Sequence, residues 1–226
     1  MMLLNKVLQE YKLMKPQRGA YAALYDEDIP CQEISSDFCL SVSPLVSVKI
    51  ITYNHEKWIK QCVESVVCQK TSFPYEVVLA EDHSTDSTFD ICKCLQSKYP
   101  DKIRLLYSDQ NVGMFRNGLR AARKTRGKYI ALLEGDDYWC DENRLEKQVK
   151  LMEKEGAGFC VGWTNVLSDL TGEMRTQHYP DKDVLTYKDF ISGIVFATST
   201  FVFKKSLWES HICRFRDIPA YDTSAS

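Results

Sequence analysis

Four short apolar segments, each followed by polar or acidic residues, set the strongest limit on how this chain folds. They cover residues 46–51, 75–80, 103–107 and 129–133, and segments with apolar residues at helical spacing lie between them. Strands that alternate with helices at this spacing predict an α/β fold with a mostly parallel sheet, flanked by helices. In such sheets, ligands bind beyond the carboxyl ends of the strands.

The helices are predicted from apolar periodicity and from residues that start or stop a helix. Asn54 is a good N-cap for a helix over residues 55–69, and Gly127, in the usual C′ position, ends a helix over residues 115–126. Further elements are expected in the order helix, strand, short helix and strand, over residues 141–156, 159–166, 187–191 and 199–203.

The composition is that of an ordinary globular protein. The chain has 226 residues, enough for one sizeable α/β domain with or without an appended segment, and 44% of them are hydrophobic and 27% charged. Lys and Arg number 29 and Asp and Glu 31, which gives a formal net charge of -2. Dedicated nucleic-acid binders carry a basic excess, so no nucleic-acid partner is expected.

Targeting signals and cysteines bear on where the protein works. Lys6 and Glu10 interrupt the apolar start, and no run of about 18 apolar residues occurs, so neither a signal peptide nor a spanning helix is expected. Nine cysteines without a Cys-x-x-Cys pair favour reduced thiols over a zinc site, with Cys62, Cys92 and Cys160 facing the core. We expect a cytoplasmic protein, with association at the inner face of the plasma membrane left open.

Residues 1–44 lack the regular pattern of the rest of the chain. This stretch contains Pro16, Gly19 and Pro30, which interrupt helices and strands, and its apolar residues show little periodicity. We therefore expect an irregular N-terminal extension over residues 1–44 and a single domain over residues 45–226.

Three carboxylates within four positions, those of Glu134, Asp136 and Asp137, follow the last of the four strands. Carboxylates this close repel one another, so a hard divalent cation would be stabilised among them. An acidic surface turn is the other interpretation. Glu81 and Asp82 follow a second strand and are expected at the same edge of the sheet, which favours a ligand site.

Two common phosphate-binding motifs are missing. No Gly-x-Gly-x-x-Gly follows the first strand and no Gly-Lys-Ser/Thr loop occurs, so neither a dinucleotide fold nor a P-loop is supported. Phosphates would then meet a metal held by Asp136 and Asp137, or Arg116 and Arg120 from the helix that follows Asn111.

Four motifs, in this order and spacing, resemble those of the family 2 glycosyltransferases, which have the nucleotide-sugar-binding GT-A fold. The resemblance is close over residues 46–154 and weak beyond them, and it points to the bacterial cell-surface glycan type. The motifs are Val48-Lys-Ile-Ile-Thr-Tyr-Asn54, Glu81-Asp-His-Ser-Thr-Asp-Ser-Thr88, Asn111-Val-Gly113 with Arg116-Asn-Gly118, and Gly127-Lys-Tyr-Ile130 leading into Leu133-Glu-Gly-Asp-Asp137.

The resemblance implies a role for each matching position. Tyr53 would flank the nucleobase and Asp82 would bind it. Asp136 would contact the ribose or the sugar, and Asp137 would ligate a Mn²⁺ or Mg²⁺ ion that bridges the diphosphate, with Glu134 as a supporting carboxylate. The donor site would be completed by Thr52, Asn54 and Arg116.

The resemblance also implies an inverting transfer, in which a base deprotonates the acceptor hydroxyl and this attacks C1 as the nucleoside diphosphate leaves. Asp222 is the best candidate for the base and Asp217 the second. Residues 45–155 would form the donor half, and residues 156–226 an acceptor-side half that we expect to be truncated. Glu81-Asp82-His83 departs from the family, which more often has two aspartates and a glycine there.

The expected function is transfer of a sugar from a UDP- or TDP-type donor to a glycan or lipid-linked acceptor hydroxyl. A sugar-nucleotide-binding domain without transfer activity is the main alternative, and a sugar nucleotidyltransferase a weaker one. Tyr138 and Trp139 fit a sugar pocket and a core equally well, whereas Trp163 is expected in the core. Solvated or capping roles are expected for His55 and His83.

Overall fold

The computed structural model describes residues 28–168, 171–177 and 197–209. The chain divides into two compact units, one of residues 1–29 with 206–226 and one of residues 30–205, and the fold and site below belong to the second. The short helix expected over residues 187–191, and the base candidates Asp217 and Asp222, lie outside the described residues.

A seven-stranded sheet forms the centre of this unit, in the order β1-β4-β3-β2-β5-β9-β6. Strands β2 to β5 are parallel, whereas β1 is antiparallel to β4, and β9 is antiparallel to both β5 and β6. The mostly parallel sheet is therefore confirmed. The strands are β1 (Gln32–Ile34), β2 (Val46–Thr52), β3 (Tyr75–Glu81), β4 (Ile103–Tyr107), β5 (Tyr129–Glu134), β6 (Phe159–Cys160) and β9 (Val202–Lys204).

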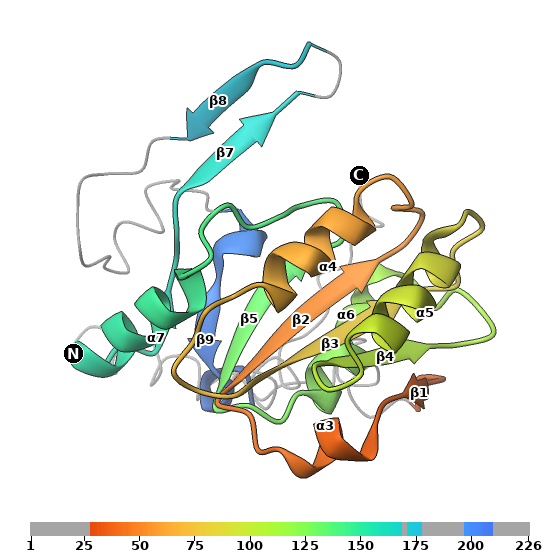
Figure 1. The fold of residues 1–226 in the computed structure, drawn as a ribbon, viewed down its shortest axis with the longest axis horizontal. Coiled ribbons are helices and arrows are strands. Elements are labelled where there is room, and N and C mark those ends of the chain that lie inside the picture. Colours follow the sequence, from red (N-terminus) through yellow and green to blue (C-terminus); the bar gives the residue numbers. More distant parts are fainter. Residues whose placement is uncertain (1–27, 169–170, 178–196, 210–226) are drawn as a thin grey trace, which may run out of the picture. The chain divides into compact units, whose positions relative to one another are not determined.

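Helices connect the parallel strands, as the alternation in the sequence predicts. In Figure 1, α4 and α5 lie in front of the sheet, over β2, β3 and β4. Strands β7 (Thr164–Leu167) and β8 (Met174–Gln177) pair in a separate antiparallel sheet of two strands. The helices are α3 (Asp37–Ser41), α4 (Ile59–Val67), α5 (Thr88–Lys98), α6 (Met114–Lys124) and α7 (Arg144–Lys154), and a 3₁₀ turn, η1, covers Thr198–Thr200.

The two faces of the sheet differ in chemistry because successive strand residues point to opposite sides. On one face, alternate residues of β2, β3 and β5 pack with α4, α5 and α7 in the main apolar core. On the other face, a smaller cluster joins Val78, Ala80 and Leu106 to Ala121 of α6. The large cluster therefore anchors the sheet, and the α6 face has room for buried polar groups.

Glu76 is the centre of the polar network on the α6 face. Its side chain is 2% exposed, and its carboxylate accepts from Ser47 Oγ at 2.6 Å, Arg104 Nη1 at 3.1 Å and Arg126 Nη2 at 2.6 Å. Arg104 also donates to Glu33, next to Gln32 of β1, at 2.8 Å. Buried carboxylates are tolerated only when paired in this way, so the network joins β1, β3 and β4.

Two predicted helix signals are wrong. Helix α4 begins at Ile59 instead of residue 55, and Asn54 does not cap it but adopts a left-handed conformation with φ 56°. Gly127 is not a C′ residue either, because α6 ends at Lys124 with an extended Thr125 after it. A Cβ on Gly127 would lie 2.6 Å from the backbone nitrogen of Ser47, so a close approach of two backbones requires glycine there.

The second half of the chain differs more from the expectations. The strand predicted over residues 159–166 is split into β6 and β7, and the one over residues 199–203 is a 3₁₀ turn followed by β9. Trp163, expected in the core, is 64% exposed, and Cys160 is only partly buried, whereas Cys62 and Cys92 are fully buried. None of the helices in the described residues has the length and apolar character needed to cross a membrane.

Candidate functional site

The carboxyl ends of three neighbouring strands meet at one edge of the sheet. Thr52 at the end of β2 pairs with Glu81 of β3, and Ile51 pairs with Glu134 of β5. Backbone bonds continue the pairing past the strand ends, from Asp82 N to Thr52 O at 3.0 Å and from Gly135 N to Ile51 O at 2.9 Å. The predicted meeting of the two acidic strand ends is confirmed.

The loops after β2 and β3 are joined by side chain to backbone hydrogen bonds. Asn54 Oδ1 accepts from Thr85 N at 2.8 Å, and Thr88 Oγ1 accepts from His55 N at 2.8 Å. Asp86 accepts from Glu56 N at 3.2 Å and from Thr88 N at 2.9 Å, so its carboxylate stabilises the loop. With residues 111–113, these segments are called the interlocked loops below (residues 53–56, 82–88 and 111–113).

Glu81 holds an unusual turn in the interlocked loops. Its carboxylate, 1% exposed, accepts from the backbone N–H groups of His83 at 3.1 Å and Ser84 at 2.7 Å. His83 has φ 57°, the left-handed region that side chains with a Cβ rarely adopt. The position where the family more often has glycine thus keeps the glycine-like backbone, and Glu81 supplies hydrogen bonds that hold it.

Asp82, the predicted base-binding residue, is buried and holds the loop after β4. Its two carboxylate oxygens accept from Val112 N and Gly113 N, both at 2.9 Å, and its backbone carbonyl accepts from Asn111 Nδ2 at 2.7 Å. Arg120 Nη2 lies 3.9 Å from Asp82 Oδ1. A role for Asp82 toward a base stays a prediction, and any such contact would be shared with these bonds.

Arg120 does not face the edge as the sequence suggested. Its guanidinium donates to Asn117, Ser108, the carbonyl of Glu81 and the carbonyl of Pro30, at 2.6–2.9 Å, and the residue is 2% exposed. Phosphate contact by Arg120 was therefore a wrong expectation. Arg116, one turn earlier in α6, is exposed, and its role toward the phosphates stays a prediction.

The acidic turn (residues 134–138) is packed against the end of β2 through Gly135. A Cβ on Gly135 would lie 2.6 Å from Thr52 Oγ1 and 2.7 Å from His55 Nδ1, so only glycine fits between them. The imidazole of His55 is 3.3 Å from Thr52 Oγ1 on one side and 4.0 Å from Asp136 Oδ2 on the other. His55 thus lies beside the predicted sugar-contacting carboxylate, which a purely solvated or capping role does not describe.

The carboxylates of the acidic turn differ in exposure. Asp136 and Asp137 are exposed, whereas Glu134 is partly buried on the α6 face. Burial raises the pKa of Glu134, and the Lys49 ammonium and a hydrogen bond from Thr198 oppose that rise. Burial also lowers the pKa of Lys49, with Glu134 acting against it. Lys49 thus supplies a positive charge beneath the turn, which supports Glu134 as the predicted supporting carboxylate.

The 3₁₀ turn η1 is the part of the site that the sequence did not reveal. Ser199 Oγ donates to Asp137 Oδ2 and accepts from Glu134 N at 3.2 Å, and Thr198 Oγ1 donates to Glu134 Oε1 at 3.3 Å. The only hint in the sequence is the polar run Thr198-Ser199-Thr200 inside an apolar-rich stretch. Sequence spacing alone cannot place it against residues more than 60 positions earlier.

The aromatic residues of the site divide between surface and core. Trp139 is buried, and its Nε1 donates to Ser199 O at 3.1 Å. The guanidinium carbon of Arg144 lies 4.3 Å from the centroid of its ring, so Trp139 is a core residue. Tyr138 is 38% exposed and Tyr53 is 43% exposed, so both offer ring surface at the edge. Thr52 is buried, with its hydroxyl near His55.

The donor set at this edge fits a divalent cation that takes most of its ligands from elsewhere. Among the described residues, no group of three or more His, Cys, Asp or Glu side chains could hold a metal ion alone. Asp137 has one carboxylate oxygen engaged by Ser199, and Asp136 is exposed beside it. Mg²⁺ is commonly held by one or two carboxylates together with substrate phosphates and water, and Mn²⁺ shares its preference for oxygen ligands.

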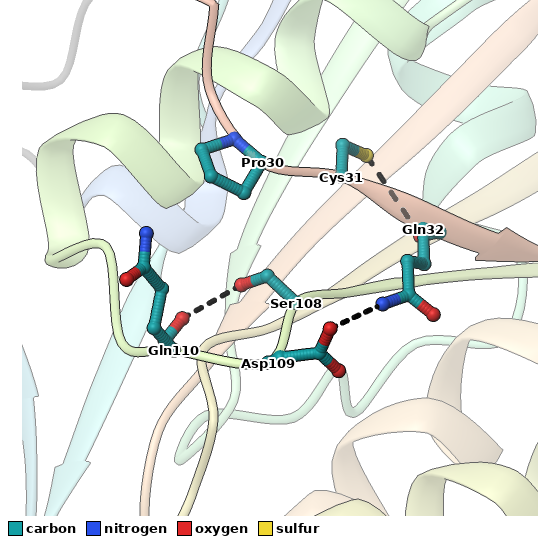
Figure 2. A pocket seen from close by; sticks show the side chains of 6 residues that line it. All are labelled: Pro30, Cys31, Gln32, Ser108, Asp109 and Gln110. Carbon is teal, nitrogen blue, oxygen red and sulfur yellow. Dashed lines mark hydrogen bonds between the residues drawn. The ribbon is translucent and has the colours of Figure 1, made fainter.

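A pocket of about 220 Å³ is lined by residues 30–32 and 108–110, at the β1 and β4 side of the sheet (Figure 2). Its lining includes Cys31 and Ser108, and Gln32 Nε2 donates to Asp109 Oδ2 at 2.8 Å across it. Strands β3 and β2 separate β4 from β5. The pocket therefore does not coincide with the carboxylates that carry the predicted chemistry.

The chain belongs to the family 2 glycosyltransferases: the sequence model of Glycosyl transferase family 2 matches residues 47–211, which is more than half of the chain. It is 32% identical over 159 residues to TuaG of Bacillus subtilis (strain 168), a protein named for teichuronic acid biosynthesis. That match covers 70% of this chain and 61% of TuaG. The chain spans from about a third to three fifths of the length of the first curated relatives it matches.

Solved structures share the fold. TarS 1-349 of S. aureus in complex with UDP has a TM-score of 0.58 and 21% identity, covering 74% of this chain and 48% of that one. The mannosyltransferase PcManGT from Pyrobaculum calidifontis, in complex with GDP-Man and Mn²⁺, has a TM-score of 0.56 and 19% identity, covering 84% and 52%. The predicted GT-A fold is confirmed by these neighbours.

Proposed function

We propose that this protein transfers a sugar from a nucleoside-diphosphate sugar, of UDP or TDP type, to the hydroxyl of a glycan or lipid-linked acceptor. Family membership supports the reaction class. The observation that carries the proposal is the meeting of Thr52, Asp82 and the exposed Asp136 and Asp137 at one carboxyl edge of a parallel sheet. The TarS complex with UDP supports a pyrimidine nucleotide, and the teichuronic acid name of TuaG supports a surface-glycan acceptor.

The residues of the edge would divide the work. The exposed ring of Tyr53 would flank the base, with Asn54, Asp82 and Thr52 shaping the pocket around it. Asp136 would contact the ribose or sugar, and Arg116 would face the phosphates. Asp137 would hold the divalent cation, Mn²⁺ or Mg²⁺, and this ion, when bound, would neutralise charge on the leaving diphosphate.

Transfer would proceed in one displacement with inversion at C1. Asp222 would take the proton of the acceptor hydroxyl, whose oxygen forms the new bond to C1 as the bond from C1 to the diphosphate oxygen breaks. The proton ends on the Asp222 carboxylate and the electron pair on the nucleoside diphosphate. General base catalysis of this kind contributes about 10²–10⁴-fold to the rate. We propose that the reaction takes place in the cytoplasm, with the membrane face as one location for a lipid-linked acceptor.

Calorimetry with a panel of nucleoside diphosphates, with and without Mn²⁺, tests the donor site. We expect metal-dependent binding of one pyrimidine diphosphate, and loss of that metal dependence in Asp137→Ala. Equal, weak responses to every nucleotide, irrespective of metal, would contradict the proposal.

The transfer step needs a separate test because a binding module would pass the first one. An active enzyme is expected to hydrolyse its donor slowly in the absence of acceptor. This hydrolysis is measured as release of the nucleoside diphosphate. Asp222→Asn should abolish transfer and leave donor binding intact. Loss of both would assign Asp222 a structural role, and donor binding without any hydrolysis or transfer would favour the sugar-nucleotide-binding module.

A further inference from the structure

The hydroxyl of Ser199 occupies the position between the two outer carboxyl residues of the acidic turn. It lies in η1, which precedes β9, and Ser199 is 6% exposed. Its Oγ contacts both Asp137 Oδ2 and the backbone N–H of Glu134. A single buried side chain thus touches the proposed metal ligand and the end of the strand that carries it.

The proton of this hydroxyl can go in only one direction. A serine hydroxyl has one hydrogen to donate and two lone pairs to accept. The N–H of Glu134 is a donor, so it uses a lone pair of Ser199 Oγ and leaves the hydrogen for the carboxylate of Asp137. Ser199 therefore fixes the rotation of that carboxylate, and among the described residues no hydrogen bond is found to its other oxygen, Oδ1.

The backbone of Ser199 is fixed independently of its hydroxyl. Its carbonyl accepts from Trp139 Nε1 at 3.1 Å and from Arg144 Nη2 at 2.9 Å, and Thr200 N bonds Ala197 O at 2.9 Å within the turn. Trp139 follows the acidic turn directly, and Arg144 begins α7. The serine is thus attached to the same elements as Asp137, so the distance between the two side chains is set by packing.

We infer that Ser199 is a positioning residue that orients the Asp137 carboxylate so that one oxygen is presented to a divalent cation. The inference rests on the proposed function, since it gives Asp137 the metal. Hydrogen-bond partners that orient a metal ligand typically contribute 10–100-fold to metal affinity. Ser199 would act only through Asp137, and it would leave the metal-independent part of nucleotide binding unchanged.

The experiment is calorimetric titration of UDP into the full chain at a fixed Mn²⁺ concentration close to the wild-type dissociation constant for the metal, and again in EDTA. We expect Ser199→Ala to weaken binding in Mn²⁺ by about 10–100-fold and to leave binding in EDTA unchanged. Ser199→Thr keeps the hydroxyl and should restore binding in Mn²⁺ to within about threefold of wild type. Thermal midpoints of all variants report any general loss of folding.

Thr200→Val is the matched control. Thr200 Oγ1 donates to Ala197 O at 2.8 Å inside the same turn, and no hydrogen bond joins it to a carboxylate of the described residues. Its removal should therefore lower the thermal midpoint without weakening the Mn²⁺-dependent binding. Equal binding by Ser199→Ala and wild type in Mn²⁺, or an equal loss in Thr200→Val, would overturn the role of Ser199 alone. A wild-type chain that binds UDP equally in Mn²⁺ and EDTA would overturn the metal role of Asp137 and, with it, this inference.

Discussion

The interlocked loops and the acidic turn lie at the same sheet edge and use their polar groups in opposite ways. In the interlocked loops, the side-chain oxygens of Asn54, Asp82 and Asp86 accept hydrogen bonds from backbone N–H groups of these loops. In the acidic turn, Asp136 and Asp137 are exposed, and within the described part of the chain the hydroxyl that donates to Asp137 is that of Ser199 in η1.

This difference separates the residues that stabilise the fold of the site from the residues that are available to bind a ligand. Buried carboxylates that accept backbone hydrogen bonds stabilise the folded state, and leaving their partners unsatisfied is costly. Exposed carboxylates contribute little to stability and remain available to a ligand. Substitutions in the interlocked loops should therefore change stability first, and substitutions in the acidic turn should change binding first.

The largest effect on stability is expected for Asp82→Ala. The variant loses the acceptor of Val112 N and Gly113 N and the carboxylate 3.9 Å from Arg120. Hydrogen bonds to charged groups contribute about 1.5–3 kcal/mol each, so the free energy of unfolding should fall by roughly 3 kcal/mol. Urea-induced unfolding measures it. Asp136→Ala, at an exposed position whose Oδ2 lies 4.0 Å from His55 Nε2, is the control and should change it by less than about 1 kcal/mol; equal losses would remove the distinction between the two regions.

An intermediate effect is expected where the two regions touch. Gly135→Ala places a methyl group 2.6 Å from Thr52 Oγ1 and 2.7 Å from His55 Nδ1. Overpacking of this kind costs about 1–3 kcal/mol, and it should also displace His55 from Asp136, so Mn²⁺-dependent nucleotide binding should weaken too. The measurements are urea unfolding and calorimetry.

Gly118→Ala is the control for that substitution. Gly118 lies inside α6, and the nearest atom to its new Cβ would be Lys49 Nζ at 3.6 Å, an ordinary contact. Alanine is favoured over glycine in helices by about 0.8–1 kcal/mol, so this variant should be slightly more stable. If both alanine variants unfold alike, the close packing of Gly135 does not limit the site.

The parallel core was predictable because its signals are local. The prediction for β4 matches the structure at both ends, and β2 and β5 each extend one residue further than expected. The edge shared by Glu81 and Glu134 then followed from the direction of parallel strands. Charge and strand order are therefore enough to predict that two acidic strand ends meet at one edge of the sheet.

The parts that failed depend on partners far along the chain. Asn54 has the chemistry of an N-cap, but its side chain accepts a hydrogen bond from Thr85, 31 residues away. It therefore stabilises the loop and does not cap the helix. Gly127 is required by the backbone of Ser47, which no helix-end rule includes. Ser199 meets Asp137 across 62 positions, and no periodicity reports such a contact.

The smallest effect is expected inside the interlocked loops, at the two left-handed residues. His83 has φ 57°, and its side chain is exposed. This conformation costs about 1–2 kcal/mol for a residue with a Cβ, and glycine avoids that cost but loses more backbone freedom on folding. His83→Gly should therefore raise the free energy of unfolding by only about 0.5 kcal/mol, measured by urea unfolding.

Asn54→Gly is the matched comparison, because Asn54 has nearly the same φ, 56°, but its Oδ1 accepts from Thr85 N at 2.8 Å. Losing that bond should lower the free energy of unfolding by about 1 kcal/mol, which exceeds the relief of strain. Opposite signs for the two variants would show that side-chain bonds, and not backbone shape alone, hold the interlocked loops. Equal stabilisation in both would mean that the Asn54 bond contributes nothing, and that these loops are no better held than the acidic turn.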